Sequence, residues 1–312
     1  MSFVIIPDTG CDLTKDLRER FGIEDYVRGV IYFENDKAEL SSLDWEKMTA
    51  EEYYKSMKNL KAPYKTASVP VGEYERAWTK ALENGQDILS ISLSSGLSTS
   101  YNESLIVAKD LMEKYPGRTI KCVDSMRYST SLALLVIMAC EKKNSGATLE
   151  ETFDYIEKEK KTIHQMGFMD DLKFLTKTGR VSNFKALMGT LVGVTPLADF
   201  NSKGMSEVLC KAKGRPAALK ATIEYMKKII VNPEDQIIFV AHSLRKEHAE
   251  ILAEDIKKTF KPKEVILNDV GMACGANIGP GLCSAYFTGK PMSESMEEER
   301  AILAQCVEAT KK

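Results

Sequence analysis

Short apolar runs alternate with amphipathic stretches along the first half of the chain. Residues 3–6, 27–33, 87–93 and 120–123 have the length and the β-branched content of strands. Before the third run, five apolar residues recur at the spacing of one helix face: Tyr74, Ala77, Trp78, Ala81 and Leu82. This alternation is typical of parallel βαβ units, so the first half is predicted to form a doubly wound parallel sheet.

The pattern changes after a charged helix predicted over residues 149–161. A turn at residues 201–204 separates two strand-like segments, and predicted strands at residues 236–241 and 264–267 flank another helix. A hairpin beside helices predicts a mixed sheet, which is an α+β arrangement.

The length of 312 residues fits two domains, at about 100–200 residues for each domain. We therefore expect an α/β protein of two domains. Residues 1–156 are predicted to carry the parallel sheet and the ligand loops, and residues 157–312 the mixed sheet.

Composition narrows the classes of function. Lys and Arg number 43 against 45 Asp and Glu, and no dense basic run is present, so a nucleic-acid partner is not expected. The seven cysteines are scattered without a C-x-x-C pair, which argues against a disulfide framework. The three histidines lack ligand-like spacing to cysteines or carboxylates, so no metal site is expected.

The N-terminus has no cationic start followed by a long apolar core, as a signal peptide would have. The longest uninterrupted apolar run, residues 132–140, is far shorter than the roughly 20 residues of a membrane helix. We therefore expect a cytoplasmic protein without an integral membrane segment.

Four segments of small or polar residues lie where predicted strands end, and ligands of open parallel sheets bind at such ends. The first segment, residues 8–12, is either part of a ligand site or an Asx turn with Asp12 as a helix cap. The second segment, residues 66–70, carries Thr66 and Ser68, which either bind a ligand or cap the next helix.

The third segment, residues 94–100, places five hydroxyl groups and Gly96 before a predicted helix. Hydroxyls, backbone N–H groups and the helix dipole together favour an anion there, unless the hydroxyls only cap the helix. Neither a Walker A loop nor a G-x-S-x-G elbow is present, and no histidine is near in sequence. No catalytic residue is therefore expected.

The fourth segment, residues 271–281, is rich in glycine. Gly279-Pro280-Gly281 is similar to the start of a dinucleotide fingerprint, but Ser284 replaces the third glycine and no suitable acidic residue follows. We interpret the segment as a tight loop whose backbone closely approaches another group, and we expect no cofactor.

Taken together, these segments resemble the DegV family of fatty-acid-binding proteins, from about Val4 to Phe287. The family pattern D-S-T-x-D is similar to residues 8–12, and T-S-Q-P-S is similar to residues 66–70, where Ala67 and Ser68 replace Ser-Gln. The pattern S-S-x-L-S-G-T-Y is similar to residues 94–101.

Three further motifs follow in the family's order. The pair D-S matches Asp124-Ser125, and L-x-x-L-x-K-x-G-R-[IV] matches residues 172–181, which include Arg180. The pattern H-x-G-P-G matches residues 277–281, with Asn277 in place of the histidine.

The resemblance implies a DegV-like fold that binds one long-chain fatty acid at the junction of two domains. Hydroxyls of the N-terminal loops and the residue at the histidine position would hold the carboxylate, and the acyl tail would lie in an apolar tunnel of the second domain. A separate fatty acid kinase would phosphorylate the carboxylate, so the chain would be a carrier and not an enzyme. The implied ligand-binding residues are Thr66, Ser94, Ser95, Gly96, Arg180, Asn277 and Gly279.

Three points of this interpretation stay open. Asn277 donates a hydrogen bond but carries no charge, which leaves the phosphorylation of the carboxylate in question. Arg180 is either a cation that meets phosphate or the kinase, or a turn residue paired with a carboxylate. The apolar residues 186–197 are either the tunnel for the tail or ordinary core.

Two other classes of function remain as alternatives to a lipid carrier. One is an enzyme that acts on a small carboxylate or phosphate at residues 94–100, although the sequence offers no activating base there. The other is a sensor or interaction protein whose ligand is structural.

Overall fold

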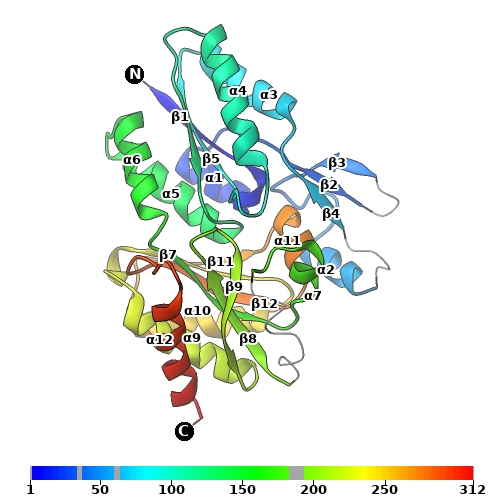
Figure 1. Ribbon diagram of the computed structural model, residues 1–312, viewed down its shortest axis with the longest axis vertical. Coiled ribbons are helices and arrows are strands. Elements are labelled where there is room, and N and C mark those ends of the chain that lie inside the picture. The colour runs from blue at the N-terminus through cyan, green and yellow to red at the C-terminus, as the bar shows by residue number, and fades with distance from the viewer. Residues whose placement is uncertain (1, 34–36, 60–63, 183–192, 312) are drawn as a thin grey trace. The chain divides into compact units, whose positions relative to one another are not determined.

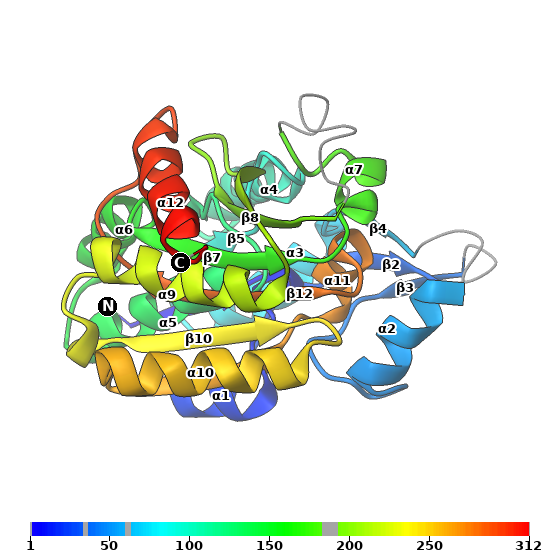
Figure 2. The ribbon, with the colours of Figure 1, turned by 90° about the horizontal axis from the view of Figure 1, so that it is seen from below.

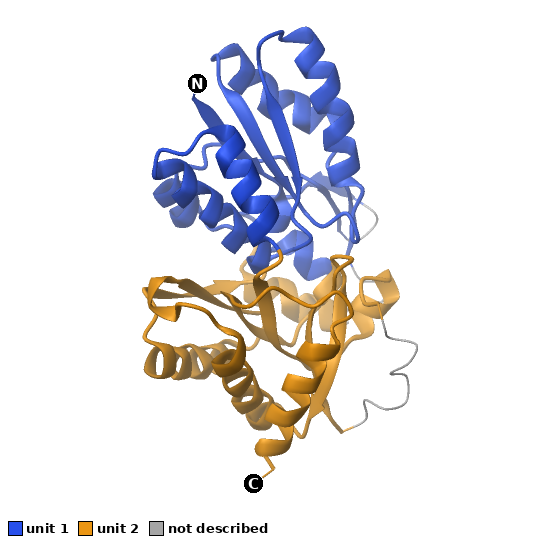
Figure 3. Ribbon diagram, turned by 60° about the vertical axis from the view of Figure 1, so that its left-hand side comes forward, with its two compact units in different colours: residues 1–47, 64–160, 271–276 blue, residues 48–63, 161–270, 277–312 orange. Residues whose placement is uncertain are grey.

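The computed structural model describes residues 2–33, 37–59, 64–182 and 193–311, which form two compact units (Figure 3). Unit 1 comprises residues 1–47, 64–160 and 271–276, and unit 2 comprises residues 48–63, 161–270 and 277–312. Each unit therefore contains a short segment from a distant part of the chain. The sequence-based boundary between residues 156 and 157 assumed two continuous halves.

Unit 1 is built on a three-stranded parallel sheet in the order β1-β5-β6. The strands are β1 (Phe3–Pro7), β5 (Asp87–Ser92) and β6 (Ile120–Asp124). Helices cover both faces of this sheet (Figure 1). The five helices are α1 (Lys15–Phe21), α3 (Val71–Glu83), α4 (Ser100–Lys114), α5 (Thr130–Asn144) and α6 (Leu149–Glu159).

The amphipathic pattern of α3 explains how one face of the sheet is covered. All five of its periodic apolar residues, from Tyr74 to Leu82, are buried in one cluster with Ile6 of β1, Ile88 of β5 and Ile120 of β6. Such burial of an apolar stripe is what fixes an amphipathic helix against a sheet. The α/β class predicted for this half is confirmed.

A small antiparallel sheet in the order β3-β2-β4 also belongs to unit 1. Its strands are β2 (Val30–Tyr32), β3 (Ala38–Leu40) and β4 (Lys65–Ala67). The strand predicted over residues 27–33 is thus shortened to β2. The sequence did not predict β4, which holds Thr66 by pairing it with Ile31 of β2.

Unit 2 contains a six-stranded mixed sheet in the order β11-β10-β12-β7-β8-β9. Its strands are β7 (Ile163–Met169), β8 (Thr195–Phe200), β9 (Ser206–Ala212), β10 (Ile237–His242), β11 (Glu264–Asp269) and β12 (Leu282–Thr288). Strands β10 and β11 pair in parallel, and the other neighbours pair antiparallel. The mixed sheet predicted for this half is confirmed.

Three helices pack on one face of this sheet, namely α9 (Arg215–Ile229), α10 (Lys246–Phe260) and α12 (Glu297–Ala309). Figure 2 shows α9 and α10 along the sheet. Alternate residues of each strand point into this core, for example Ile238 and Val240 of β10 and Cys283 and Ala285 of β12. Shorter helices are α2 (Ala50–Asn59), α7 (Lys173–Thr178) and α11 (Met272–Ile278).

Two sequence-based expectations concern the apolar and glycine-rich segments of the second half. Residues 186–192 of the proposed tail tunnel lie outside the described residues, and residues 195–197 begin β8. The segment 271–281, predicted as a loop, instead forms helix α11 followed by a turn. Strand β12, directly after this turn, was not predicted.

Candidate functional site

Three polar loops leave the same edge of the unit 1 sheet, because β1, β5 and β6 run parallel. The carboxylate of Asp8, after β1, accepts hydrogen bonds from the backbone N–H groups of Gly10 and Leu93, both at 2.7 Å. The backbone N–H of Ser94 donates to the carbonyl of Arg127, which lies beyond β6, at 2.9 Å. We call this place the carboxyl edge of unit 1.

The serines of the third segment differ in their bonding. The Ser95 hydroxyl donates to the Asp124 carboxylate, which also accepts a hydrogen bond from the Ser95 backbone N–H at 3.1 Å. The Ser94 hydroxyl oxygen accepts from the backbone N–H of Gly96 at 3.2 Å, and Ser94 is fully buried. The Ser95 hydroxyl is thus bonded to a carboxylate, whereas the Ser94 oxygen accepts a backbone bond within its own loop.

The second and third segments are joined at the N-terminus of α4. Ser68 and Thr99 both donate from their hydroxyls to the Glu103 carboxylate, at 2.9 and 2.7 Å. The hydroxyl of Ser100 accepts from the backbone N–H of Val69 at 3.1 Å. Residues 66–70 are thus bonded to the first turn of α4.

The capping interpretation of the second segment is wrong. The residue that precedes α3 is Pro70, and among the described residues no side chain caps that helix. Thr66 lies instead in β4, half-buried, and Ser68 bonds to Glu103. No local pattern indicates this arrangement, because β4 is only three residues long and depends on its partner strand.

The first segment forms the expected Asx turn, since Asp8 accepts from Gly10 two residues on. Asp12 is not a helix cap, because the hydroxyl of Thr14 accepts the capping bond of α1. Asp12 is buried, has a left-handed backbone (φ 50°), and accepts a hydrogen bond from the Ser129 hydroxyl. It therefore ties the first loop to the start of α5.

Burial changes the acidity of both carboxyl groups at this edge. Loss of solvent raises the pKa of Asp8 to about 6, although bonds from Leu93 and Gly10 oppose the rise. Loss of solvent raises the pKa of Asp12 to about 7, against the opposing bonds from Ser129 and Gly271. Asp12 is therefore partly protonated near neutral pH.

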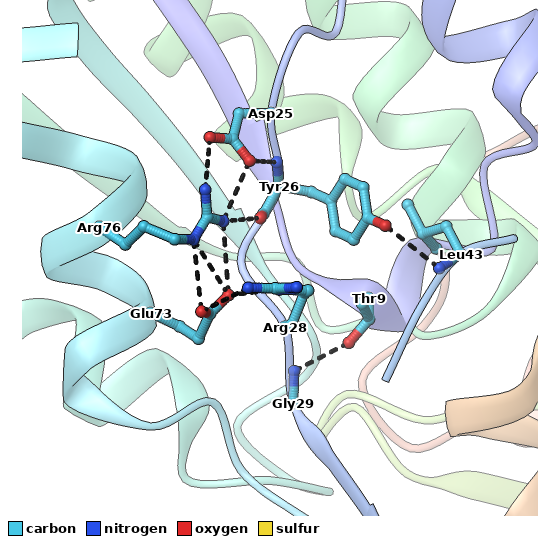
Figure 4. Close-up of polar contacts among 8 residues, drawn as sticks. All are labelled: Thr9, Asp25, Tyr26, Arg28, Gly29, Leu43, Glu73 and Arg76. Atoms are coloured by element: carbon cyan, nitrogen blue, oxygen red, sulfur yellow. Dashed lines mark hydrogen bonds and ion pairs between the residues drawn. The ribbon is translucent and has the colours of Figure 1, made fainter. Parts of the chain in front are cut away.

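A network of charged side chains fixes the chain ahead of β2 (Figure 4). The guanidinium of Arg28 donates two bonds to Glu73 of α3, at 2.7 and 2.8 Å, and Arg76 donates to the same carboxylate at 3.3 Å. The backbone N–H of Gly29 donates to the Thr9 hydroxyl at 3.0 Å. These bonds hold the start of β2 against α3 and the first loop.

In unit 2, the glycine-rich turn closely approaches α7, as the sequence predicted for this segment. Gly279 has a left-handed backbone (φ 75°), and a Cβ there would lie 2.2 Å from the ring of Phe174. Only glycine fits such a position. Asn277 is half-buried in the last turn of α11, two residues earlier.

Arg180 follows Gly179, whose left-handed backbone ends α7. The backbone N–H of Arg180 donates to the carbonyl of Leu175 at 2.8 Å, and its guanidinium donates to the carbonyl of Thr178. Over the described ranges, no carboxylate lies within 4 Å of it. Arg180 therefore caps its own helix and keeps guanidinium N–H groups for other acceptors.

An ionic cluster that the sequence analysis missed lies at the end of β7. Asp170 accepts from Arg215 at the start of α9, at 2.7 Å, and from Arg245 ahead of α10, at 2.6 Å. Gly281 also approaches Asp170 closely, since a Cβ there would lie 2.9 Å from the Asp170 Cβ. The available signal was the position of an acidic residue directly after a strand.

Several kinds of site are not found in the part of the chain that the structure describes. No group of three or more His, Cys, Asp or Glu side chains there is placed to hold a metal ion. No described helix has the length and apolar character needed to cross a bilayer. All seven cysteines are unpaired, and five of them are buried.

These features define a mixed α/β protein with polar loops at the carboxyl ends of parallel strands. A family profile described as "Uncharacterised protein, DegV family" matches residues 2–290. A DegV domain-containing protein of Clostridium perfringens is 32% identical over 287 residues, which cover 92% of this chain and 97% of that protein. The chain therefore belongs to the DegV family.

Two solved structures of low sequence identity share the fold. A fatty-acid-binding DegV family protein from Thermus thermophilus has a TM-score of 0.83 at 22% identity, covering 92% of this chain and 100% of that chain. The fatty acid kinase (Fak) B3 protein of Streptococcus pneumoniae, loaded with linoleic acid, has a TM-score of 0.78 at 20% identity, covering 92% and 99%.

Proposed function

We propose that this protein binds one long-chain fatty acid and presents its carboxylate to a separate fatty acid kinase. The observation that carries the proposal is the match of residues 2–290 to the DegV family. Two solved structures of the same fold support it, one of a fatty-acid-binding DegV family protein and one of a protein loaded with linoleic acid. The polar carboxyl edge of unit 1 supports it, because a buried carboxylate needs several hydrogen-bond donors.

Ser94 and Thr66 are the donors that we assign to the fatty acid carboxylate. Ser94 is fully buried at the carboxyl edge of unit 1, where its oxygen accepts from the backbone N–H of Gly96, and Thr66 is half-buried on β4. Ser95 is the less suitable donor, because its proton goes to Asp124 and an ionised Asp124 repels a second carboxylate. Gly96 contributes by donating its backbone N–H to the Ser94 oxygen, which fixes that hydroxyl.

In unit 2, we assign supporting roles to Asn277, Gly279 and Arg180. Asn277 offers an amide donor, and Gly279 allows the turn that follows it. Arg180 offers a cation to the phosphate formed on the carboxylate or to the kinase. Burial of a 16–18-carbon tail, at about 0.8 kcal/mol per CH₂, supplies on the order of 10 kcal/mol before entropic costs.

An acyl-phosphate assay tests the carrier role. The protein loaded with oleate is incubated with ATP, with and without a bacterial fatty acid kinase, and acyl phosphate is trapped as hydroxamate. We expect hydroxamate only when the kinase is present, because the chain has no assigned catalytic group. Hydroxamate formed without the kinase would mean that the chain is itself an enzyme. If no hydroxamate forms with a kinase that is active on its own carrier protein, the chain does not present oleate to that kinase.

A further inference from the structure

Unit 2 contains a cavity of about 730 Å³ that the fatty acid proposal does not use. It lies at the carboxyl ends of the parallel strands β10 and β11, whose last residues, His242 and Asp269, are paired in register. Ligands of α/β sheets bind beyond such strand ends. The volume falls within the range of roughly 300–1,000 Å³ that holds small organic ligands.

The N-terminus of α10 forms part of the cavity wall. Lys246, Glu247 and His248, which make up its first turn, all line the cavity. Among the described residues no side chain caps this 15-residue helix. Its first N–H groups have no partner within the helix and carry the positive end of the helix dipole, a combination that attracts anions.

Cationic side chains surround this helix end. Lys246 is exposed and has no carboxylate within 4 Å in the described parts of the chain. Arg215 and Arg245 also line the cavity and share the single carboxylate of Asp170, which leaves one positive charge in excess within this cluster. Over the whole lining, three Lys and Arg side chains equal three Asp and Glu side chains in number. Both features favour a ligand with a negative charge.

His242 supplies a separate indication that the cavity takes a ligand. The residue is only 9% exposed, and its Nδ1 atom has no hydrogen-bond partner in the structure. Oδ1 of Asp269 lies 3.3 Å from Nδ1 but outside hydrogen-bond geometry. Nδ1 itself has almost no accessible surface, so a ligand reaches it only if the imidazole turns towards the cavity. A buried polar atom without a hydrogen bond is costly, which favours that turn when a ligand offers a polar group.

The remaining walls indicate what else the ligand carries. The carboxylates of Glu51, Glu247 and Asp269 line the cavity and oppose a bare anion, but they accept hydrogen bonds from hydroxyl groups. Leu267 on β11 is 44% exposed and, with Leu244, offers an apolar surface. A ligand that fits the cationic helix end, these carboxylates and the apolar surface has an anionic end and a larger part with hydroxyl groups.

We propose that this cavity binds a small phosphomonoester, with the phosphate at the first turn of α10 beside Lys246. The hydroxyl-bearing part of the molecule lies against His242 and the carboxylates. The proposal concerns unit 2 alone and does not depend on fatty acid binding.

Calorimetric titration tests the proposal. The ligands are adenosine 5′-monophosphate and glycerol 3-phosphate, and the controls are adenosine, glycerol and inorganic phosphate. At least one phosphomonoester is expected to bind about tenfold more tightly than its dephosphorylated counterpart, which corresponds to about 1.4 kcal/mol. Its affinity is expected to fall as salt is added. Equal affinities with and without phosphate, or no binding of either phosphomonoester, would overturn the proposal.

Charge reversal at Lys246 tests whether the phosphate binds at the first turn of α10. Lys246→Glu is expected to weaken binding of the phosphomonoester about five- to tenfold. Lys258→Glu, on an exposed position of the same helix outside the cavity lining, is the matched control and leaves affinity unchanged. Equal affinities of both variants would mean that the phosphate does not bind beside Lys246. The salt dependence of the wild-type protein tests the phosphate contact without any substitution.

Discussion

Ser94 and Ser95 are neighbours in the chain whose hydroxyl groups have different partners. Because a hydroxyl at this buried position can donate to a carboxylate, Ser94→Ala is expected to weaken fatty acid binding by about 1–3 kcal/mol. Ser95→Ala is the matched control and is expected to change the affinity little, since its hydroxyl is bonded to Asp124. Titration of delipidated protein with oleate measures both affinities.

If Ser95→Ala weakens binding more than Ser94→Ala does, the carboxylate binds at Ser95 and the assignment to Ser94 is wrong. Thr66→Ala, on β4, is expected to resemble Ser94→Ala. Unchanged affinity in Thr66→Ala and Ser94→Ala together would remove the carboxyl edge of unit 1 from the binding site.

Asp12 makes stability depend on pH. Its pKa is about 7 in the folded state against an ordinary value of 3.8, so the folded protein holds a proton that the unfolded chain has released. The contribution of Asp12 to the free energy of unfolding therefore falls as pH rises from about 4 to about 7, by at most about 4 kcal/mol. Asp12→Asn removes this dependence.

Chemical denaturation of both proteins between about pH 4 and 8 measures the effect. The difference in unfolding free energy, wild type minus Asp12→Asn, is expected to decrease across that range, because Asp8 titrates in both proteins. A difference that does not change with pH would mean that Asp12 keeps an ordinary pKa when folded.

At the scale of elements, the turn at Gly279 joins α11 to β12. Gly279→Ala is expected to destabilise the protein by about 3 kcal/mol, since its backbone is left-handed and a Cβ overlaps the ring of Phe174. Gly72→Ala, in the first turn of α3, has nothing within 4 Å of its Cβ and an ordinary φ. It is expected to be neutral or to stabilise by up to about 1 kcal/mol.

Unfolding free energies of the two alanine variants, measured by denaturant titration, check this contrast. Equal stabilities would show that the turn relaxes without cost and that the approach to Phe174 does not constrain residue 279.

Elements with a strong internal period could be predicted from the sequence, and those that depend on a partner could not. The apolar stripe of α3 appears as expected. Strand β12 was missed because it is buried along both faces and so lacks an alternating pattern. Strand β4 was missed because only its pairing with β2 makes it a strand.

The same limit applies to the candidate site. Residues 8–12 and 94–100 were identified because small polar residues follow apolar strands, and the structure brings both segments to one sheet edge. The partner of Ser95, Asp124, lies 29 residues away, so no local pattern indicates it. The cavity beside His242 depends on parallel pairing of β10 and β11, which the sequence also does not specify.

At the scale of the whole molecule, Asn277 takes the position of the histidine in the pattern H-x-G-P-G that residues 277–281 resemble. An amide does not titrate between pH 5 and 8, so Asn277 is expected to cause no change of fatty acid affinity with pH in that range. Asn277→His is expected to bind oleate more tightly as pH falls towards about 6, because a protonated imidazole attracts the carboxylate. Binding isotherms of both proteins from about pH 5.5 to 8 decide the matter. Parallel pH profiles would mean that residue 277 does not contact the carboxylate or its network.

The central claim is that the folded protein holds one long-chain fatty acid. Native mass spectrometry of the protein purified from bacterial cells tests this most directly, with extraction of the ligand to identify it. We predict a mass excess equal to one fatty acid, which delipidation removes and added oleate restores. A protein that shows only the mass of its chain and takes up no oleate, or one that carries a different class of ligand in its place, would contradict the claim.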